Sequence, residues 1–107
     1  MATLTITGRS GKQYVFTIYD INTTFKVVAG LYLFTRLLED KKTHKYIYLG
    51  ITNDLSARFG NHHKDDCIKM NGSTHISICL VSDQAARENA EKDILAAINT
   101  TCNEKMN

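Results

Sequence analysis

Proline and tryptophan are absent from this chain of 107 residues, and it has only six glycines and three cysteines. No proline-rich or glycine- and serine-rich stretch offers a linker between domains. No apolar run reaches the about 18 residues that a membrane-spanning helix needs. Residues 1–12 lack the apolar core of a signal peptide. We therefore expect one cytoplasmic domain with no membrane segment.

Charge is also close to balanced, with 13 basic and 11 acidic residues and a net charge of +2. Hydrophobic residues make up 43% of the chain and charged residues 22%, which is typical of a globular protein and excludes a disordered one. A strongly basic domain would indicate nucleic-acid binding. In this chain, any such surface has to be a local patch.

The three cysteines are Cys67, Cys79 and Cys102, so at least one stays unpaired if two form a bond. Because no secretory signal precedes them, we interpret all three as reduced thiols. Cys79 lies within an alternating apolar segment, and free cysteine is among the most buried residue types. We expect Cys79 to lie in the core.

Alternation of apolar and polar residues with period two predicts five strands. Turn residues at 8–11 join the first two into a hairpin, and a polar loop joins the next two. The predicted strands cover residues 3–7, 13–19, 30–35, 46–50 and 75–81.

Two helices are predicted after the fourth and fifth strands. Residues 52–54 are helix N-cap types, and an apolar face follows through residue 62. Residues 65–74 are expected to be irregular. The last helix runs from about 84 to 99 after a cap at residues 82–83, with an apolar stripe at Ala86, Ala90, Ile94 and Ala97. This order predicts an α+β fold, an antiparallel sheet with helices packed on it.

Two triplets on neighbouring predicted strands carry the chemistry. They read Gly-Leu-Tyr, ending at Tyr32, and Tyr-Leu-Gly, beginning at Tyr48. Arg58 follows ten positions after Tyr48, on the next predicted helix, and Asn103 stands twelve positions after Glu91. This pattern resembles the GIY-YIG nuclease family over about residues 30–103, with leucine in place of isoleucine in both triplets.

The resemblance implies a metal-dependent endonuclease that hydrolyses phosphodiester bonds, with DNA as the expected substrate. Its fold would be a central antiparallel sheet flanked by helices. Residues 30–107 would form the catalytic domain, and residues 1–29 an extra N-terminal β-hairpin packed on it. The family's roles, carried over residue by residue, make Tyr32 the general base, Tyr48 and His62 positioning groups, Arg58 the phosphate clamp and Asn103 an anchor.

The resemblance implies that Glu91 is the metal ligand. One carboxylate suffices for Mg²⁺ or Mn²⁺ when the substrate phosphate and waters complete the coordination. Contacts to the nucleic-acid backbone position a substrate without reading its sequence. The candidates for such contacts are Lys45, His63, Lys64 and Lys69.

Other interpretations of the same residues remain open. The tyrosines are also common strand residues, and Arg87–Glu91 and Glu88–Lys92 have the spacing of surface ion pairs on a helix. A non-catalytic module that binds nucleic acid or protein would keep the same fold. A zinc-stabilised accessory protein is a third reading, with His62, His63, Cys67 and Cys102 as ligands at an irregular spacing.

Overall fold

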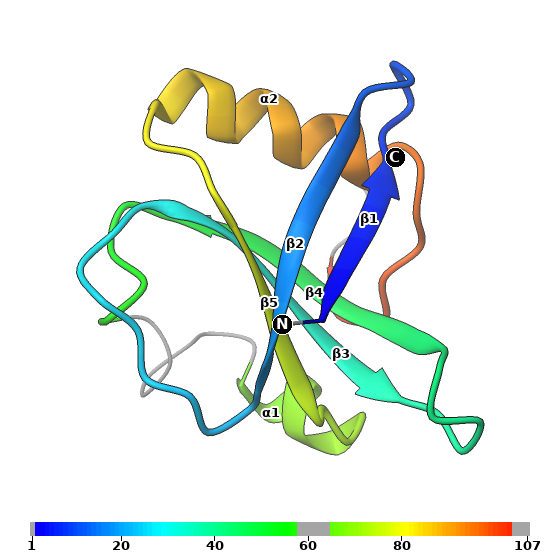
Figure 1. The fold of residues 1–107 in the computed structure, drawn as a ribbon. Helices are drawn as coiled ribbons and strands as arrows, with labels where there is room; N and C mark the ends of the chain where they lie inside the picture. Colours follow the sequence, from blue (N-terminus) through cyan, green and yellow to red (C-terminus); the bar gives the residue numbers. More distant parts are fainter. Residues whose placement is uncertain (1, 58–64, 104–107) are drawn as a thin grey trace.

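A computed structural model describes residues 2–57 and 65–103 as a small α+β domain (Figure 1). Its five strands form one curled antiparallel sheet in the order β1-β2-β5-β3-β4. Within the described residues, no helix is both long and apolar enough to cross a membrane. The elements are β1 (Thr3–Thr7), β2 (Gln13–Asp20), β3 (Gly30–Leu37), β4 (His44–Thr52), α1 (Asp65–Met70), β5 (His75–Leu80) and α2 (Gln84–Leu95).

All five predicted strands are confirmed, with small shifts at their ends. The interior strand β3 pairs with the edge strand β4 on one side and with β5, the middle strand of the sheet, on the other. Its residues 30–35 are all buried. Because successive strand side chains point to opposite faces, β3 supplies both halves of the core. Leu31 and Leu33 pack on one face with Phe16, and Tyr32 and Phe34 pack on the other.

Each face of the sheet carries its own helix (Figure 1). Helix α2 packs through Ala90 and Ile94 against the face of Leu31 and Leu33. Helix α1 contributes Ile68 to the cluster on the opposite face, which also contains the two tyrosines of the triplets. The predicted arrangement of helices on an antiparallel sheet is therefore confirmed.

The β1–β2 hairpin belongs to the same sheet, because β2 pairs with β5. Its turn uses Gly11 at a φ of 91°, a conformation that favours glycine. The carboxylate of Asp93 on α2 accepts hydrogen bonds from the backbone N–H and hydroxyl of Ser10, at 2.8 and 2.7 Å, and from the hydroxyl of Tyr14 at 2.8 Å. This contact ties the hairpin to α2 across the curl of the sheet.

Helix α2 begins as predicted, since the side chain of Asp83 accepts a hydrogen bond from the backbone N–H of Ala86. Its buried face differs from the predicted stripe. Arg87, Ala90 and Ile94 are buried, whereas Ala86 and Ala97 are exposed. Small alanines fit either face of a helix, so the position where α2 meets the sheet decides which of them is covered.

The segment between β4 and β5 also differs from prediction. Residues 53–57 form bends and turns rather than the start of a helix, and the rest of the predicted helix, to residue 62, lies outside the described residues. The Asp54 side chain accepts hydrogen bonds from the backbone and hydroxyl of Ser56, which favours a turn at this point. Helix α1 instead forms at Asp65–Met70, where irregular structure was predicted.

The prediction of three reduced cysteines is wrong for two of them. Cys67 in α1 and Cys102 near the C-terminal end form a disulfide with a Cα–Cα distance of 6.0 Å. Cys79 is free and partly buried against the core. The pair is separated by 35 positions in sequence, and only the tertiary fold brings the two thiols together. The disulfide also removes Cys67 and Cys102 as thiolate ligands, so two of the four ligands of the zinc hypothesis are lost.

We expect Asp93→Asn to lower the melting temperature at pH 7. The two carboxylate oxygens of Asp93 together accept three hydrogen bonds, whereas an amide has one acceptor oxygen and cannot accept all three. The Ser10 and then the Tyr14 hydrogen bonds hold the pKa of Asp93 below its usual range. A carboxyl whose pKa is lower in the folded than in the unfolded protein stabilises the folded state at pH values above the unfolded-state pKa. This contribution is lost as the pH falls through the folded-state pKa. The difference from wild type should therefore shrink below about pH 4 in thermal melts.

Asp66→Asn is the matched control for that comparison. The side chain of Asp66 is exposed and makes no hydrogen bond within the described part of the chain. Its substitution should leave the melting temperature unchanged both at pH 7 and below about pH 4. A melting difference for Asp93→Asn that stays constant down to pH 2 would contradict the proposed tether.

Reduction of the Cys67–Cys102 disulfide should lower the free energy of unfolding by about 2–4 kcal/mol, because the bond restricts the unfolded chain. Urea unfolding with and without a reductant measures this difference. The Cys67→Ser/Cys102→Ser double variant should not respond to the reductant, and Cys79→Ser should respond as wild type does. Titration of three thiols in the denatured, unreduced chain would show that the bond does not form.

Candidate functional site

The structure brings Tyr32 and Tyr48 together on one face of the sheet. Tyr32 lies opposite Gly50 in the β3–β4 register, and Phe34 lies opposite Tyr48. The rings of the two tyrosines have centroids 6.1 Å apart and planes tilted by 34°. Both are largely buried, at 2% exposure for Tyr32 and 9% for Tyr48. The two triplets of the sequence therefore meet in space as one cross-strand cluster.

Gly50 is what allows the ring of Tyr32 to lie across β4. A Cβ atom at this position would overlap Cζ and Oη of Tyr32. Any larger residue would push the phenol away from the strand or distort the β3–β4 pairing. The glycine of the Tyr-Leu-Gly triplet thus has a physical reason, which is to set the position of the Tyr32 hydroxyl.

A bulge in β4 shapes the same face. The register shifts between Phe34 and Thr35, so that Phe34 pairs with Tyr48 and Thr35 with Tyr46. Ile47 is the extra residue, and it joins Tyr48 in the cluster of the tyrosine face. The bulge puts two consecutive large side chains beside Tyr32 and excludes water from its ring.

Asn103 seals the outer edge of β4 beside this cluster. Its Oδ1 accepts a hydrogen bond from the backbone N–H of Leu49 at 2.8 Å, and its Nδ2 donates to the Leu49 carbonyl at 2.9 Å. The Thr100 hydroxyl donates to the same Oδ1 at 2.7 Å and orients the amide. The backbone N–H of Cys102 donates to the Ile47 carbonyl at 2.7 Å. This segment satisfies an edge that would otherwise be open to pairing.

Glu91 lies on α2, which packs on the face of Leu31 and Leu33, opposite the face that carries the tyrosine pair. Glu91 is half-buried and makes no hydrogen bond or ion pair within the described residues. Burial, and then the charge of Glu88, raise the pKa of its carboxyl. A bound cation would stabilise the ionised form of such a group.

Glu91 is a single carboxylate, which matches a hard cation that takes few ligands from the protein. No group of three or more histidine, cysteine, aspartate or glutamate side chains gathers within the described ranges, 2–57 and 65–103. Mg²⁺ keeps several of its waters and takes one or two protein carboxylates with substrate phosphate. A single half-buried carboxylate without a described partner fits that requirement.

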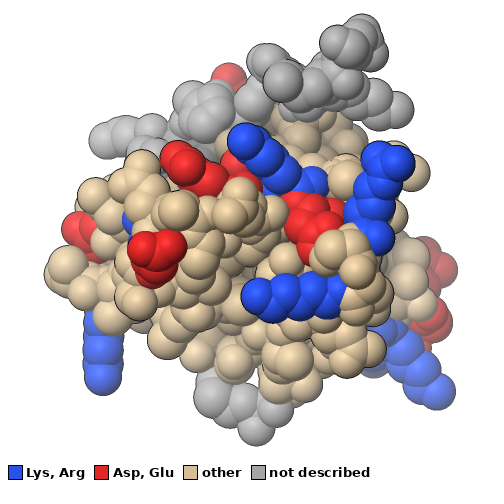
Figure 2. Space-filling view, turned by 90° about the horizontal axis from the view of Figure 1, so that it is seen from above, with Lys and Arg blue, Asp and Glu red and all other residues tan. Residues whose placement is uncertain are grey.

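The remaining predicted residues divide into two groups. Lys45 on β4 and Lys69 on α1 are exposed. The face of the molecule seen in Figure 2 shows lysine and arginine interspersed with aspartate and glutamate, without a large patch of one sign. Four predicted residues lie outside the described residues, and they are Arg58, His62, His63 and Lys64.

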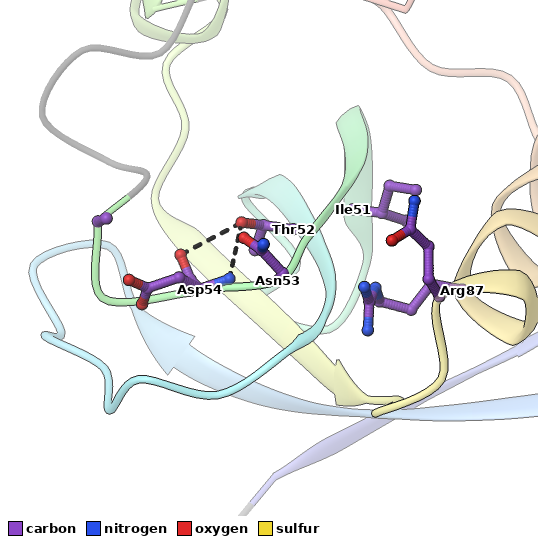
Figure 3. A pocket seen from close by; sticks show the side chains of 7 residues that line it. Ile51, Thr52, Asn53, Asp54 and Arg87 are labelled. Atoms are coloured by element: carbon purple, nitrogen blue, oxygen red, sulfur yellow. Dashed lines mark hydrogen bonds between the residues drawn. The ribbon is translucent and has the colours of Figure 1, made fainter.

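Arg87 is a residue whose environment the sequence reading missed. The spacing to Glu91 suggested an exposed ion pair, but Arg87 is only 5% exposed and donates instead to the carbonyls of Val81 and Ser82. It lines a pocket of about 410 Å³ at the end of β4, together with Thr52 and others (Figure 3). Its position four residues after the Asp83 cap, on the same face as Ala90 and Ile94, is the signal that could have shown its burial.

Comparisons of the chain with models of known protein families, with curated proteins and with solved structures found no match. The resemblance to GIY-YIG nucleases therefore rests on the motifs of the sequence. The geometry described above supports a functional proposal without identifying the family.

We expect Gly50→Ala to lower the free energy of unfolding by about 1–3 kcal/mol, because the added methyl group collides with the Tyr32 ring. Combining it with Tyr32→Leu, which removes Cζ and Oη, should recover much of that loss. Urea unfolding of the wild type, both single variants and the double variant measures the coupling. Simple additivity of the two losses would mean that the ring does not lie over Gly50.

Proposed function

We propose that this protein is a metal-dependent endonuclease of the GIY-YIG type that hydrolyses phosphodiester bonds, with DNA as its substrate. The observation that carries the proposal is the Tyr32–Tyr48 pair, set against Gly50 across neighbouring strands. The positions of Arg58 and Glu91 in the sequence relative to these triplets support it. The fold supports it at the coarser level of an antiparallel sheet with helices on both faces.

In the proposed reaction, a water oxygen attacks phosphorus and the bond to the leaving oxygen breaks. Tyr32 takes the proton of the attacking water as general base, and Tyr48 positions the water or the phosphate. Arg58 binds the phosphate bidentately and stabilises the developing charge. His62 hydrogen-bonds the phosphate or orients Tyr32, and Asn103 holds the backbone of β4 next to Tyr48.

Glu91 would hold the divalent ion, Mg²⁺ or Mn²⁺, whose chemistry when bound is to neutralise charge on the phosphate oxygens. The half-buried carboxylate has no described partner of its own. Lys45 and Lys69, with His63 and Lys64, are the proposed contacts to the nucleic-acid backbone. Because the net charge is only +2, binding should be weak. Contacts to backbone phosphates should make it weaken further as the salt concentration rises.

A second candidate is a nucleic-acid-binding or protein-interaction module that does not catalyse a reaction. Two observations favour it. Tyr32 is only 2% exposed, and α2 with Glu91 packs on the opposite face of the sheet. Both are consistent with tyrosines that stabilise the fold through aromatic packing.

Cleavage of supercoiled plasmid, single-stranded and branched DNA and RNA, with Mg²⁺, Mn²⁺ or EDTA, separates the two candidates. Tyr32→Phe keeps the ring that packs in the core and removes the hydroxyl, so it should reduce cleavage by about 10²–10⁴-fold. Tyr46→Phe is its control, because Tyr46 lies on the other face and its hydroxyl makes no hydrogen bond within the described chain.

Glu91→Gln tests the metal ligand in the same assay. It should abolish both cleavage and Mn²⁺ binding, because the amide lacks the charge that a divalent ion requires. Glu88→Gln removes an exposed carboxylate from the same helix and should leave both intact. Cleavage that persists in Tyr32→Phe and Glu91→Gln would contradict the proposed roles. Binding without cleavage in the wild type would favour the second candidate.

A further inference from the structure

Arg87 is a buried cation without a counter-ion. Its guanidinium carries a positive charge, yet the side chain is only 5% exposed and no carboxylate lies within ion-pair distance among the described residues. Nη1 donates to the Val81 and Ser82 carbonyls at 3.0 and 2.8 Å. Nε and Nη2 have no acceptor within the described part of the chain. Removing most of a cation's surface from water without a counter-ion costs free energy that a bound anion would offset.

The two unpaired nitrogens open into the pocket at the end of β4. In the described structure, Ser77 Oγ is the one buried side-chain nitrogen or oxygen without a partner, so Nε and Nη2 of Arg87 each retain contact with solvent. Figure 3 shows the guanidinium projecting from α2 toward the strand end that carries Thr52. The pocket of about 410 Å³ is lined by Ile51, Thr52, Asn53, Asp54, Ala57, Gln84 and Arg87.

The surroundings of this pocket favour an anion. Its wall includes Gln84, the first residue of α2, where the helix dipole places partial positive charge. Among the described lining residues Asp54 is the one carboxylate, and its side chain points away from Arg87 (Figure 3). That carboxylate accepts hydrogen bonds from the backbone N–H and hydroxyl of Ser56. The Thr52 hydroxyl on the same wall donates to the Asp54 carbonyl at 3.2 Å and accepts from the Asp54 backbone N–H at 3.1 Å, so its proton is already engaged and Arg87 is the donor open to an anion (Figure 3).

We propose that this pocket binds a phosphate group, with the free edge of the Arg87 guanidinium as its ligand. The planar fork of arginine matches two phosphate oxygens, and the anion would supply the missing counter-charge. The proposal stands on Arg87 and the pocket alone. Only the identity of the source, a nucleic-acid backbone or free phosphate, depends on the proposed nuclease function. Thr52, on the wall of this pocket, lies two residues beyond Gly50 on β4.

Gln84→Glu provides the sharpest test, because it places a carboxylate on the pocket wall without changing the size of the side chain. An acidic residue in the first turn of a helix is favourable, so the variant should fold. Ala85→Glu is the matched control: it adds the same charge to the same turn, but Ala85 is exposed and does not line the pocket. Thermal melts of both variants check the fold.

The full-length chain is titrated with millimolar inorganic phosphate, and amide chemical shifts are followed by NMR. We expect shifts at the backbone amides of Thr52, Asn53 and Gln84, and an affinity about tenfold weaker in Gln84→Glu than in wild type or Ala85→Glu. The absence of shifts at these amides, or equal weakening in both variants, would overturn the proposal.

A second titration with a short single-stranded DNA identifies the source of the phosphate. DNA that shifts the same amides and competes with inorganic phosphate identifies a nucleic-acid phosphate as the ligand. DNA that leaves them unchanged identifies free phosphate, and the pocket site stands without the nucleic-acid link. Because this readout needs no cleavage, a failure of the nuclease proposal and a failure of the phosphate site are distinguished.

Discussion

The pairing of β3 with both β4 and β5 is the constraint on which the rest of this structure depends. As an interior strand, β3 is buried from Gly30 to Thr35, and its alternate side chains supply both faces of the sheet. Tyr32 occupies a place that exists only because Gly50 stands opposite it and leaves room for the ring. The position of the phenol is therefore set by backbone pairing and not by a flexible loop, which is how a precise polar group is best held.

The two ends of the chain complete this sheet in different ways. The N-terminal hairpin extends it through β2 and fastens its turn to α2, where burial and the Asp93 hydrogen bond raise the pKa of Tyr14 to about 12. The C-terminal segment covers the edge of β4 through Asn103, and the disulfide at Cys102 joins that segment to α1. Asn103 thus has a structural task that the nuclease proposal also uses, because it holds β4 in place next to Tyr48.

Helix α2 carries two charges that do not neutralise each other. Arg87 and Glu91 have the spacing of an ion pair, but Arg87 turns toward the loop carbonyls of Val81 and Ser82, and Glu91 has no partner within the described residues. An intrahelical pair at a surface would contribute little to stability. Kept apart, the same charges match the two ligands proposed above, a cation at Glu91 and a phosphate at Arg87.

The sequence by itself determined the strands, the hairpin turn and the cap of α2, because alternation, glycine at a positive φ and the Asp83 side chain act over a few neighbouring residues. It also placed the two triplets on neighbouring strands, and the strand register then brought their tyrosines onto one face. Only the tertiary structure decided the disulfide, the buried face of α2 and the packing of α2 on the face of the sheet opposite the tyrosines. These depend on how elements distant in sequence pack, and packing can bury an arginine that local spacing places at the surface.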